Sequence, residues 1–213
     1  MAVFPDDSPH RPGRARLLGL SLLAVLVCLG VLAEAFHLAH RSTLARIVLE
    51  AEVAARSRAL AVESEFAKQR AVAAILADDS QVRDALAAPT PAATAAMSRK
   101  LDRLQDETQS SVIYVLDLTG TAVAASNWDE PDSFVGSSYA FRDYFAVALR
   151  EGTAQQFALG TVSHRPGLYL SHVVGEGFGV VVVKVEFTAI EASWAASADR
   201  TFVTEPDGRV VLA

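Results

Sequence analysis

One short stretch of the sequence concentrates side chains that could hold an anion. It reads Ser138-Tyr139-Ala140-Phe141-Arg142-Asp143-Tyr144-Phe145. If the stretch is helical, its spacings place Tyr139 and Arg142 on one face, with Tyr144 beside them. A guanidinium can bind a carboxylate through two parallel hydrogen bonds, so the stretch predicts a carboxylate-binding site. The alternative is that its phenylalanines belong to the core and Arg142 pairs with Asp143 or another surface acid.

Lys184 is a second candidate cation, because it interrupts an otherwise apolar strand pattern over residues 178–186. A buried lysine needs a counter-charge. Together with Arg142, it could hold two separate carboxylates of one small molecule. Hydroxyls and backbone donors of 160–163 and Tyr169, expected on neighbouring strands, could add hydrogen bonds. The alternatives are that Lys184 points to solvent from a half-exposed strand and that these hydroxyls are ordinary strand residues.

Other chemistry is excluded or weakly indicated. The sequence contains no GxSxG, HExxH, P-loop or GxGxxG motif, so no catalytic residue is predicted. Its five histidines are dispersed; His37 and His40 lie one helical turn apart and are better explained as interfacial residues than as metal ligands. The single cysteine, Cys28, excludes an internal disulfide and a Cys-based zinc site. A net charge of −6 argues against nucleic-acid binding.

The apolar character of the chain is concentrated near its start. No residue from Leu17 to Ala33 is charged. As a helix this segment spans roughly 25 Å, the short end of a membrane crossing, and apolar residues continue to Leu38. Three arginines precede it, so the positive-inside rule predicts cytoplasmic residues 1–16, a membrane helix over 17–38 and an exterior remainder. The alternative is a cleaved secretory signal, with Ala33-Glu34-Ala35 as the cleavage site.

Helices are predicted next, over residues 41–110. From Arg41 to about Ala77 the sequence contains no Gly or Pro and approximates one apolar stripe, which predicts a long helix. A short helix is expected over 81–87. Pro89-Thr90-Pro91 then breaks the chain, and Thr90 is the expected N-cap of a helix that continues to about Glu107.

The hydrophobic period changes from helical to alternating at Ser110. Strands are predicted over residues 112–117, 121–126, 155–162, 168–174 and 178–186. A polar loop over 127–138 and a helix over 141–150, ended by Gly152, separate the second strand from the third. The expected class is α+β, with a five-stranded antiparallel sheet on a long helix, as in sensor domains.

The end of the chain repeats the strand–turn–strand pattern of 112–126. A connecting helix is expected over 190–198, followed by strands over 201–204 and 209–212. A terminal hairpin alone would leave an open edge and an incomplete core, so we expect the chain to be the N-terminal part of a longer protein. The predicted domain organisation has five segments, at 1–16, 17–38, 41–110, 111–187 (the ligand-binding lobe) and 188–213 (the start of a second lobe).

Several motifs together resemble one protein family. They are Ile113–Asp117, Ala124–Trp128, Phe134-Val135-Gly136-x-x-Tyr139-x-Phe141-Arg142-x-Tyr144-Phe145, Phe157–Thr161, Pro166–Tyr169, Val180–Phe187 and Thr201–Thr204. Over roughly residues 17–213 the chain resembles the periplasmic sensor region of C4-dicarboxylate sensor histidine kinases of the DctB type. The resemblance implies a double Cache (tandem PAS-like) domain between two membrane helices, whose membrane-distal lobe binds succinate, fumarate or malate.

The resemblance also implies roles for individual residues. Arg142 and Lys184 would bind the carboxylates, and hydrogen bonds would come from Tyr139, Tyr144, Thr161, Tyr169, Ser138 and Ser163. It further implies an inner-membrane homodimer that controls dicarboxylate uptake through a response regulator. The chain departs from the family because it lacks most of the second lobe, the second membrane helix, the phospho-accepting histidine and the ATP site. No cofactor is therefore expected in this chain, and ATP only in the missing kinase core.

Two other functions stay open. The same fold could serve a chemoreceptor or a diguanylate cyclase that binds another small ligand, such as an amino acid. Such a pocket would need an acidic partner for the ammonium group, whereas two cations favour a dianion. The chain could also be an inert anchored protein.

Overall fold

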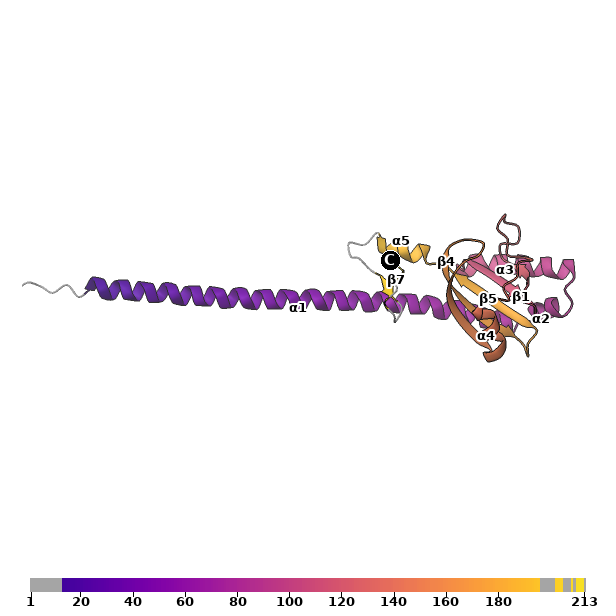
Figure 1. Ribbon diagram of the computed structural model, residues 1–213. Coiled ribbons are helices and arrows are strands. Elements are labelled where there is room, and N and C mark those ends of the chain that lie inside the picture. Colours follow the sequence, from indigo (N-terminus) through magenta and orange to yellow (C-terminus); the bar gives the residue numbers. More distant parts are fainter. Residues whose placement is uncertain (1–12, 196–201, 205–207, 209, 213) are drawn as a thin grey trace, which may run out of the picture. The chain divides into compact units, whose positions relative to one another are not determined.

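The computed structural model describes residues 13–195, 202–204, 208 and 210–212 (Figure 1). The chain divides into two compact units, Met1–Arg58 and Ala59–Ala213. Helix α1 runs from Gly13 to Ala77. Among the described residues it is the one helix long and apolar enough to cross a membrane, judged by length and composition. The predicted division of the chain into five segments stays a prediction, and residues 1–12 of its first segment lie outside the described ones.

The next two helices form much as predicted. Helix α2 covers Ser80–Ala87, and the side chain of its N-cap Asp79 accepts a hydrogen bond from the Gln81 amide at 2.9 Å. Helix α3 covers Pro91–Thr108, and the Thr90 hydroxyl accepts one from the Ala93 amide at 3.2 Å. Each cap satisfies an amide that has no partner inside the helix.

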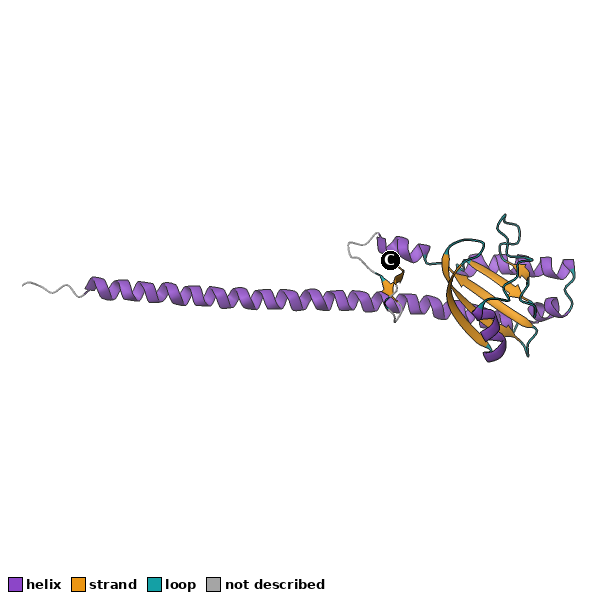
Figure 2. Cartoon of the chain, in the orientation of Figure 1, coloured by secondary structure: helices purple, strands orange, loops and turns teal. Residues whose placement is uncertain are grey.

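A five-stranded antiparallel sheet follows, in the order β2-β1-β5-β4-β3 (Figure 2). The strands are β1 (Val112–Leu116), β2 (Ala122–Ala125), β3 (Thr153–Leu159), β4 (Pro166–Val174) and β5 (Gly179–Val185). This confirms the predicted α+β class. In this register Lys184 of β5 lies opposite Val112 of β1 and Tyr169 of β4.

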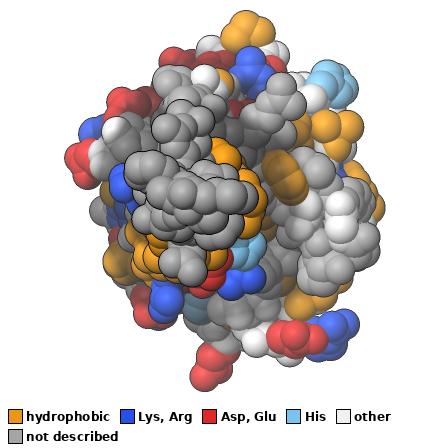
Figure 3. All heavy atoms as spheres, turned by 90° about the vertical axis from the view of Figure 1, so that its left-hand side faces the viewer, with side chains coloured by type: hydrophobic (Ala, Val, Ile, Leu, Met, Phe, Trp, Pro, Cys, Tyr) orange, Lys and Arg blue, Asp and Glu red, His pale blue; other side chains and the backbone are white. Residues whose placement is uncertain are grey.

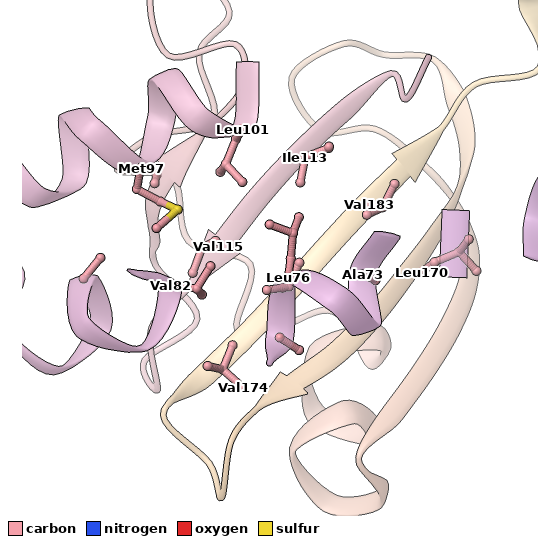
Figure 4. Packing of buried hydrophobic residues seen from close by; sticks show 14 of the residues in the cluster. Ala73, Leu76, Val82, Met97, Leu101, Ile113, Val115, Leu170, Val174 and Val183 are labelled. Atoms are coloured by element: carbon pink, nitrogen blue, oxygen red, sulfur yellow. The ribbon is translucent and has the colours of Figure 1, made fainter. Parts of the chain in front are cut away.

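One side of the sheet, called here the aliphatic face, is covered by the end of α1 and by α2 and α3. Alternate strand residues such as Ile113, Leu170 and Val183 pack there against the helices (Figure 4). Leu101 of α3 has no exposed surface, and Met97 lies beside it. Because the alternation has a period of two, the neighbouring residues of each strand belong to the opposite side.

That opposite side, called here the tyrosine face, is covered by helix α4 (Asp143–Glu151) and by the loop before it. Tyr114 of β1 and Tyr169 of β4 project onto it, where they meet Tyr144 of α4 and Tyr139 of the loop. All four side chains are at least 97% buried, their exposures being 0%, 2%, 0% and 3% respectively. The candidate site is built on this face.

Two predicted boundaries near the site are wrong. Helix α4 begins at Asp143 rather than at 141, because Arg142 has extended dihedral angles (φ −86°, ψ 135°) and serves as the N-cap. Tyr139 therefore lies in a loop, not on a shared helix face with Arg142. Strand β3 ends at Leu159, and the next residues turn back through hydrogen bonds from the Gly160 amide to the Arg165 carbonyl and from the His164 amide to the Gly160 carbonyl.

The remaining elements belong to the end of the chain. Helix α5 covers Thr188–Ala195, and strands β6 (Val203–Thr204) and β7 (Val210–Leu212) form an antiparallel pair. The predicted connecting helix extended to 198 and the predicted hairpin turn included 205–207; these residues lie outside the described part of the chain.

Candidate ligand-binding site

The loop that carries Tyr139 is pressed against the β1–β2 hairpin. The Tyr139 amide donates a hydrogen bond to the Gly120 carbonyl at 2.7 Å. Gly120 has φ +80°, and a Cβ there would lie 2.6 Å from the Ala140 nitrogen, so only glycine permits this approach. The buried Asn127 side chain closes the loop from within by donating to the Asp132 carbonyl and accepting from the Phe134 amide.

Arg142 is held at the start of α4 with part of its guanidinium unused. One terminal nitrogen, Nη2, donates to the Leu159 carbonyl at 2.7 Å. The guanidinium carbon lies 5.0 Å from the centre of the Phe141 ring and 5.8 Å from that of Tyr169. Nε is buried without a hydrogen-bond partner. No carboxylate among the described residues forms an ion pair with Arg142, so the alternative of a surface acid partner does not hold there.

Lys184 is completely buried, with 0% of its side chain exposed, so it does not point to solvent. Its ammonium donates to the Ser163 hydroxyl at 2.7 Å and to the carboxylate of Glu186. Glu186 also pairs with Arg165 at 3.5 Å. The predicted need for a counter-charge is thus met from within the chain.

The tyrosines form a connected set of rings and hydroxyls. The Tyr114 and Tyr144 hydroxyls lie 2.7 Å apart and share a hydrogen bond. The Tyr144 and Tyr169 rings stack with their centres 5.0 Å apart and their planes at 8°. The Tyr139 hydroxyl is buried and has no partner at hydrogen-bond geometry. The tyrosine face therefore contains two buried donors without partners, the Tyr139 hydroxyl and Arg142 Nε.

Burial shifts these phenols further toward their neutral form. It raises the pKa of Tyr114 and of Tyr144 well above the usual value, and it raises that of Tyr169 to about 12, although Arg142 opposes the last shift. For Tyr139, burial also raises the pKa, partly offset by Ser137, Thr161 and Arg142 nearby. At neutral pH all four hydroxyls therefore keep their protons and can donate hydrogen bonds.

Two glycines bring the β3–β4 turn close to Lys184. A Cβ at Gly160 would lie 2.4 Å from the Ser163 Oγ and 3.2 Å from the Tyr169 Oη. A Cβ at Gly167 would lie 2.9 Å from the Val185 carbonyl oxygen and 3.2 Å from the Lys184 Cε. The absence of side chains at these positions therefore lets the turn place its hydroxyl beside both the lysine and a tyrosine.

The structure brings most of the predicted site residues together. Tyr139, Arg142, Tyr144 and Tyr169 lie in one cluster, and Lys184 lies opposite Tyr169 with Ser163 bonded to it. Thr161 is exposed in the turn and close enough to Tyr139 to lower its pKa. Ser138 is exposed, in a bridge with Thr121. The ligand roles of all eight residues stay predictions.

Sequence reasoning missed two members of the site. Tyr114 shares its face with Leu116, as the alternation along β1 could have indicated. Glu186 follows Lys184 by two positions, a spacing that puts both side chains on the same side of a strand. Missing Glu186 matters more, because its carboxylate changes the net charge of the candidate site.

A separate hollow of about 550 Å³ lies beside the start of β3. Its polar lining comes from Arg70, Glu151, Thr153, Gln155, Ser171 and His172. None of the predicted site residues lines it. No group of three or more His, Cys, Asp or Glu side chains able to hold a metal occurs within the described ranges.

Comparison with known proteins identifies the relatives of this chain. No protein-family model matches it. The C4-dicarboxylate transport sensor protein DctB of Rhizobium meliloti (strain 1021) is 42% identical over 221 residues, covering 100% of this chain and 35% of that protein. The chain thus spans about a third of that relative's length.

Solved structures agree with the sequence comparison. The sensor domain of the V. cholerae histidine kinase DctB matches with a TM-score of 0.69 and 26% identity, over 76% of this chain and 65% of that one. The sensory domain of the Campylobacter jejuni chemoreceptor Tlp3 with isoleucine bound matches with a TM-score of 0.57 and 15% identity, over 74% and 65%. That second likeness concerns the fold alone. The chain is therefore a homologue of the DctB-type C4-dicarboxylate transport sensor proteins along its whole length, and its sheet-containing lobe has the fold of a DctB sensor domain.

Proposed function

We propose that this chain is the extracytoplasmic sensor portion of a two-component sensor histidine kinase, and that its tyrosine face binds a C4-dicarboxylate such as succinate, fumarate or malate. Binding would signal across the membrane to control dicarboxylate transport. The proposal draws on the relative from Rhizobium meliloti, whose name gives C4-dicarboxylate transport. It also draws on the positively charged side chains of Arg142 and Lys184 at the candidate site.

One observation carries the proposal. Arg142 Nε and Tyr139 Oη are buried without hydrogen-bond partners. The two residues are close enough for the charge of Arg142 to lower the pKa of Tyr139. Buried polar groups are nearly always paired, because leaving one unpaired costs about 1–3 kcal/mol. A ligand carboxylate beside Arg142 would accept hydrogen bonds from both atoms. This would offset a cost that the fold otherwise bears.

The charge of the site supports a dianion. Arg142, Lys184 and Arg165 contribute three positive charges, and Glu186 contributes one negative charge, which leaves a balance of +2. A dicarboxylate with charge −2 would neutralise it. On the face drawn in Figure 3, by contrast, the coloured acidic and basic side chains are scattered among hydrophobic ones.

Location and partners follow from the same assignment. The apolar part of α1 would lie in the inner membrane, with the lobe in the periplasm. The protein would act as a homodimer and pass its signal to a response regulator through a kinase region. ATP would be needed only there.

A second candidate ligand is an amino acid, since the site contains the acidic group that an ammonium ion would need. The fold is shared with a chemoreceptor domain that binds isoleucine. However, Glu186 already holds two cations, Lys184 and Arg165. An added ammonium would raise the positive balance around it, so the dicarboxylate is the better fit.

Calorimetric titration of the full-length protein tests the proposal. Succinate should bind to the natural protein, and L-serine and isoleucine should not. Arg142→Ala should weaken succinate binding tenfold to a hundredfold, about 1.5–3 kcal/mol for a charge-assisted hydrogen bond. Arg150→Ala is the matched control, because Arg150 lies on the same helix but is exposed and paired with Glu151. Absence of heat with every C4-dicarboxylate, or equal affinities for the two variants, would sink the proposal.

A further inference from the structure

The carboxylate of Glu186 accepts a hydrogen bond from the buried ammonium of Lys184. The Lys184 side chain has no exposed surface, whereas 16% of the Glu186 side chain is exposed. A lysine ammonium has three hydrogens to donate. Ser163 and Glu186 accept two of them, which leaves one for a ligand. A ligand carboxylate must therefore share the ammonium with Glu186 or replace it.

We propose that Glu186 is an internal competitor that sets the affinity and the charge selectivity of the site. The inference rests on the proposed dicarboxylate function. Removing a partner from a buried ion is costly, so the buried ammonium of Lys184 needs a carboxylate beside it. Glu186 supplies it from the chain itself. The arriving ligand then meets a like charge at the Lys184 end, which lowers its net gain in binding.

The surroundings of Glu186 offer its carboxylate a second partner. Its other carboxylate oxygen lies 3.5 Å from the Arg165 guanidinium, whose side chain is 67% exposed. On release from Lys184 the carboxylate can turn toward Arg165 and solvent without becoming an unpaired buried charge. Displacement by a ligand is therefore feasible at this position, as it would not be for a fully enclosed ion pair.

Ser111, just before β1, holds the backbone of the pair through two hydrogen bonds. The Glu186 amide donates to the Ser111 hydroxyl at 2.7 Å, and the Ser111 amide donates to the Lys184 carbonyl at 3.0 Å. Exchange of Glu186 for a ligand can therefore take place through side-chain rotation alone. The strand that carries Lys184 keeps its place during the exchange.

Competition at only one end of the site has a consequence for selectivity. A monocarboxylate can bind to Arg142 and Tyr139 without reaching Lys184. A dicarboxylate must place its second group where Glu186 already is. Neutralising Glu186 should therefore favour the dicarboxylate much more than the monocarboxylate, and a merely structural ion pair would show no such difference.

The test compares Glu186→Gln with the natural full-length protein by calorimetry, using succinate and butyrate as probes. The glutamine side chain still accepts a hydrogen bond from Lys184 but carries no charge. We expect succinate to bind about tenfold more tightly to the variant, and butyrate affinity to change by less than about threefold. Glu176→Gln is the matched control, since Glu176 is exposed in the turn between β4 and β5.

Each result has a defined meaning. Unchanged or weaker succinate binding in folded Glu186→Gln, or equal gains for both probes, would overturn the inference. If that variant does not fold, Glu186→Asp replaces it: the carboxylate is one methylene further from Lys184, so succinate should bind more tightly than to the natural protein, and no gain would refute the idea. Failure of the natural protein to bind any dicarboxylate would instead reject the proposed function itself.

Discussion

The two faces of the sheet are made by alternating residues of the same strands and serve different purposes. On β5, Val183 packs into the aliphatic face, and the next residue, Lys184, is buried on the opposite side. The aliphatic face contains no charged side chain in its core and is sealed by three helices. On the tyrosine face, the tyrosine side chains and the lysine side chain are buried to a similar extent. Similar burial thus serves packing on one face and, in the proposed function, ligand recognition on the other.

The two faces also differ in how their polar groups are satisfied. Near the aliphatic face, the Ser110 hydroxyl donates to the buried Gln69 side chain at 2.6 Å, and Gln69 donates to the Thr108 carbonyl at 3.1 Å. Three buried side-chain atoms of the described residues have no partner. One is Gln105 Oε1 on α3; the other two, on Tyr139 and Arg142, lie at the tyrosine face. Two unpaired donors on one face are consistent with the proposed binding of a carboxylate there.

The largest expected effect is a loss of stability caused by a substitution in the aliphatic face. Leu101→Ala removes a fully buried side chain and leaves a cavity, which should lower the free energy of unfolding by about 2–5 kcal/mol. Succinate affinity of the folded fraction should stay within about twofold, since sites without shared partners act independently. Hydrogen exchange of the β1 amides and calorimetry measure the two quantities. Leu118→Ala, an exposed leucine, is the control.

A smaller effect is expected where a phenol of the tyrosine face is already paired. Tyr114→Phe leaves the buried Tyr144 hydroxyl without a partner, which should lower the free energy of unfolding by about 1–3 kcal/mol. The double variant Tyr114→Phe/Tyr144→Phe removes both hydroxyls and should recover part of this loss. Additive losses in the double-mutant cycle would show that the two hydroxyls do not act as a pair.

Where the phenol is unpaired, a tyrosine-to-phenylalanine substitution should reduce succinate affinity rather than stability. Tyr139→Phe removes a buried hydroxyl without a partner, so stability should hold or rise slightly. Succinate affinity should fall, by about 0.5–1.5 kcal/mol for one neutral hydrogen bond. Unfolding and binding are measured on the same preparation. A loss of stability with no change in affinity would assign Tyr139 to packing instead.

The smallest expected effect is a pH-dependent contribution to stability from Asp79, the N-cap of helix α2 on the aliphatic side. Burial alone would raise the pKa of Asp79, but the hydrogen bond and charge of Lys100, with the Gln81 and Val82 amides, lower it overall. A lowered pKa stabilises the fold above the ordinary value of 3.8. This contribution, below about 1 kcal/mol, disappears as the pH falls through the folded-state pKa. Asp79→Asn should therefore reduce stability at pH 7 and not at pH 2; an equal loss at both would contradict this assignment.

Sequence patterns predicted the framework better than the site's local geometry. Thr90 and Pro91 fix the start of α3 because capping is a local interaction, and the strand periods gave all five strands of the sheet. The start of α4 was misplaced because the packing of its preceding loop, through Gly120, decides it. Residues 160–162 after Leu159 were likewise predicted as strand, because a β-branched Thr-Val pair does not reveal that the chain reverses at Gly160.

The candidate residues were predictable by type, but their mutual pairing was not. Arg142 and Lys184 stood out as cations in apolar surroundings. Glu186 did not, because a glutamate at the end of a strand is ordinary until its side chain is known to turn inward. Its carboxylate is also paired with Arg165 of the β3–β4 turn, and the same turn places Ser163 against the Lys184 ammonium. Such pairings depend on tertiary contacts that no single segment contains.

A crystal structure of the full sensor region with succinate tests the account most directly. We predict one carboxylate of succinate within hydrogen-bond distance of Arg142 and the Tyr139 hydroxyl, and the other within that distance of Lys184. Succinate in the hollow lined by Arg70, Glu151 and His172, with Arg142 Nε still unpaired, would contradict the assignment of the tyrosine face as the binding site.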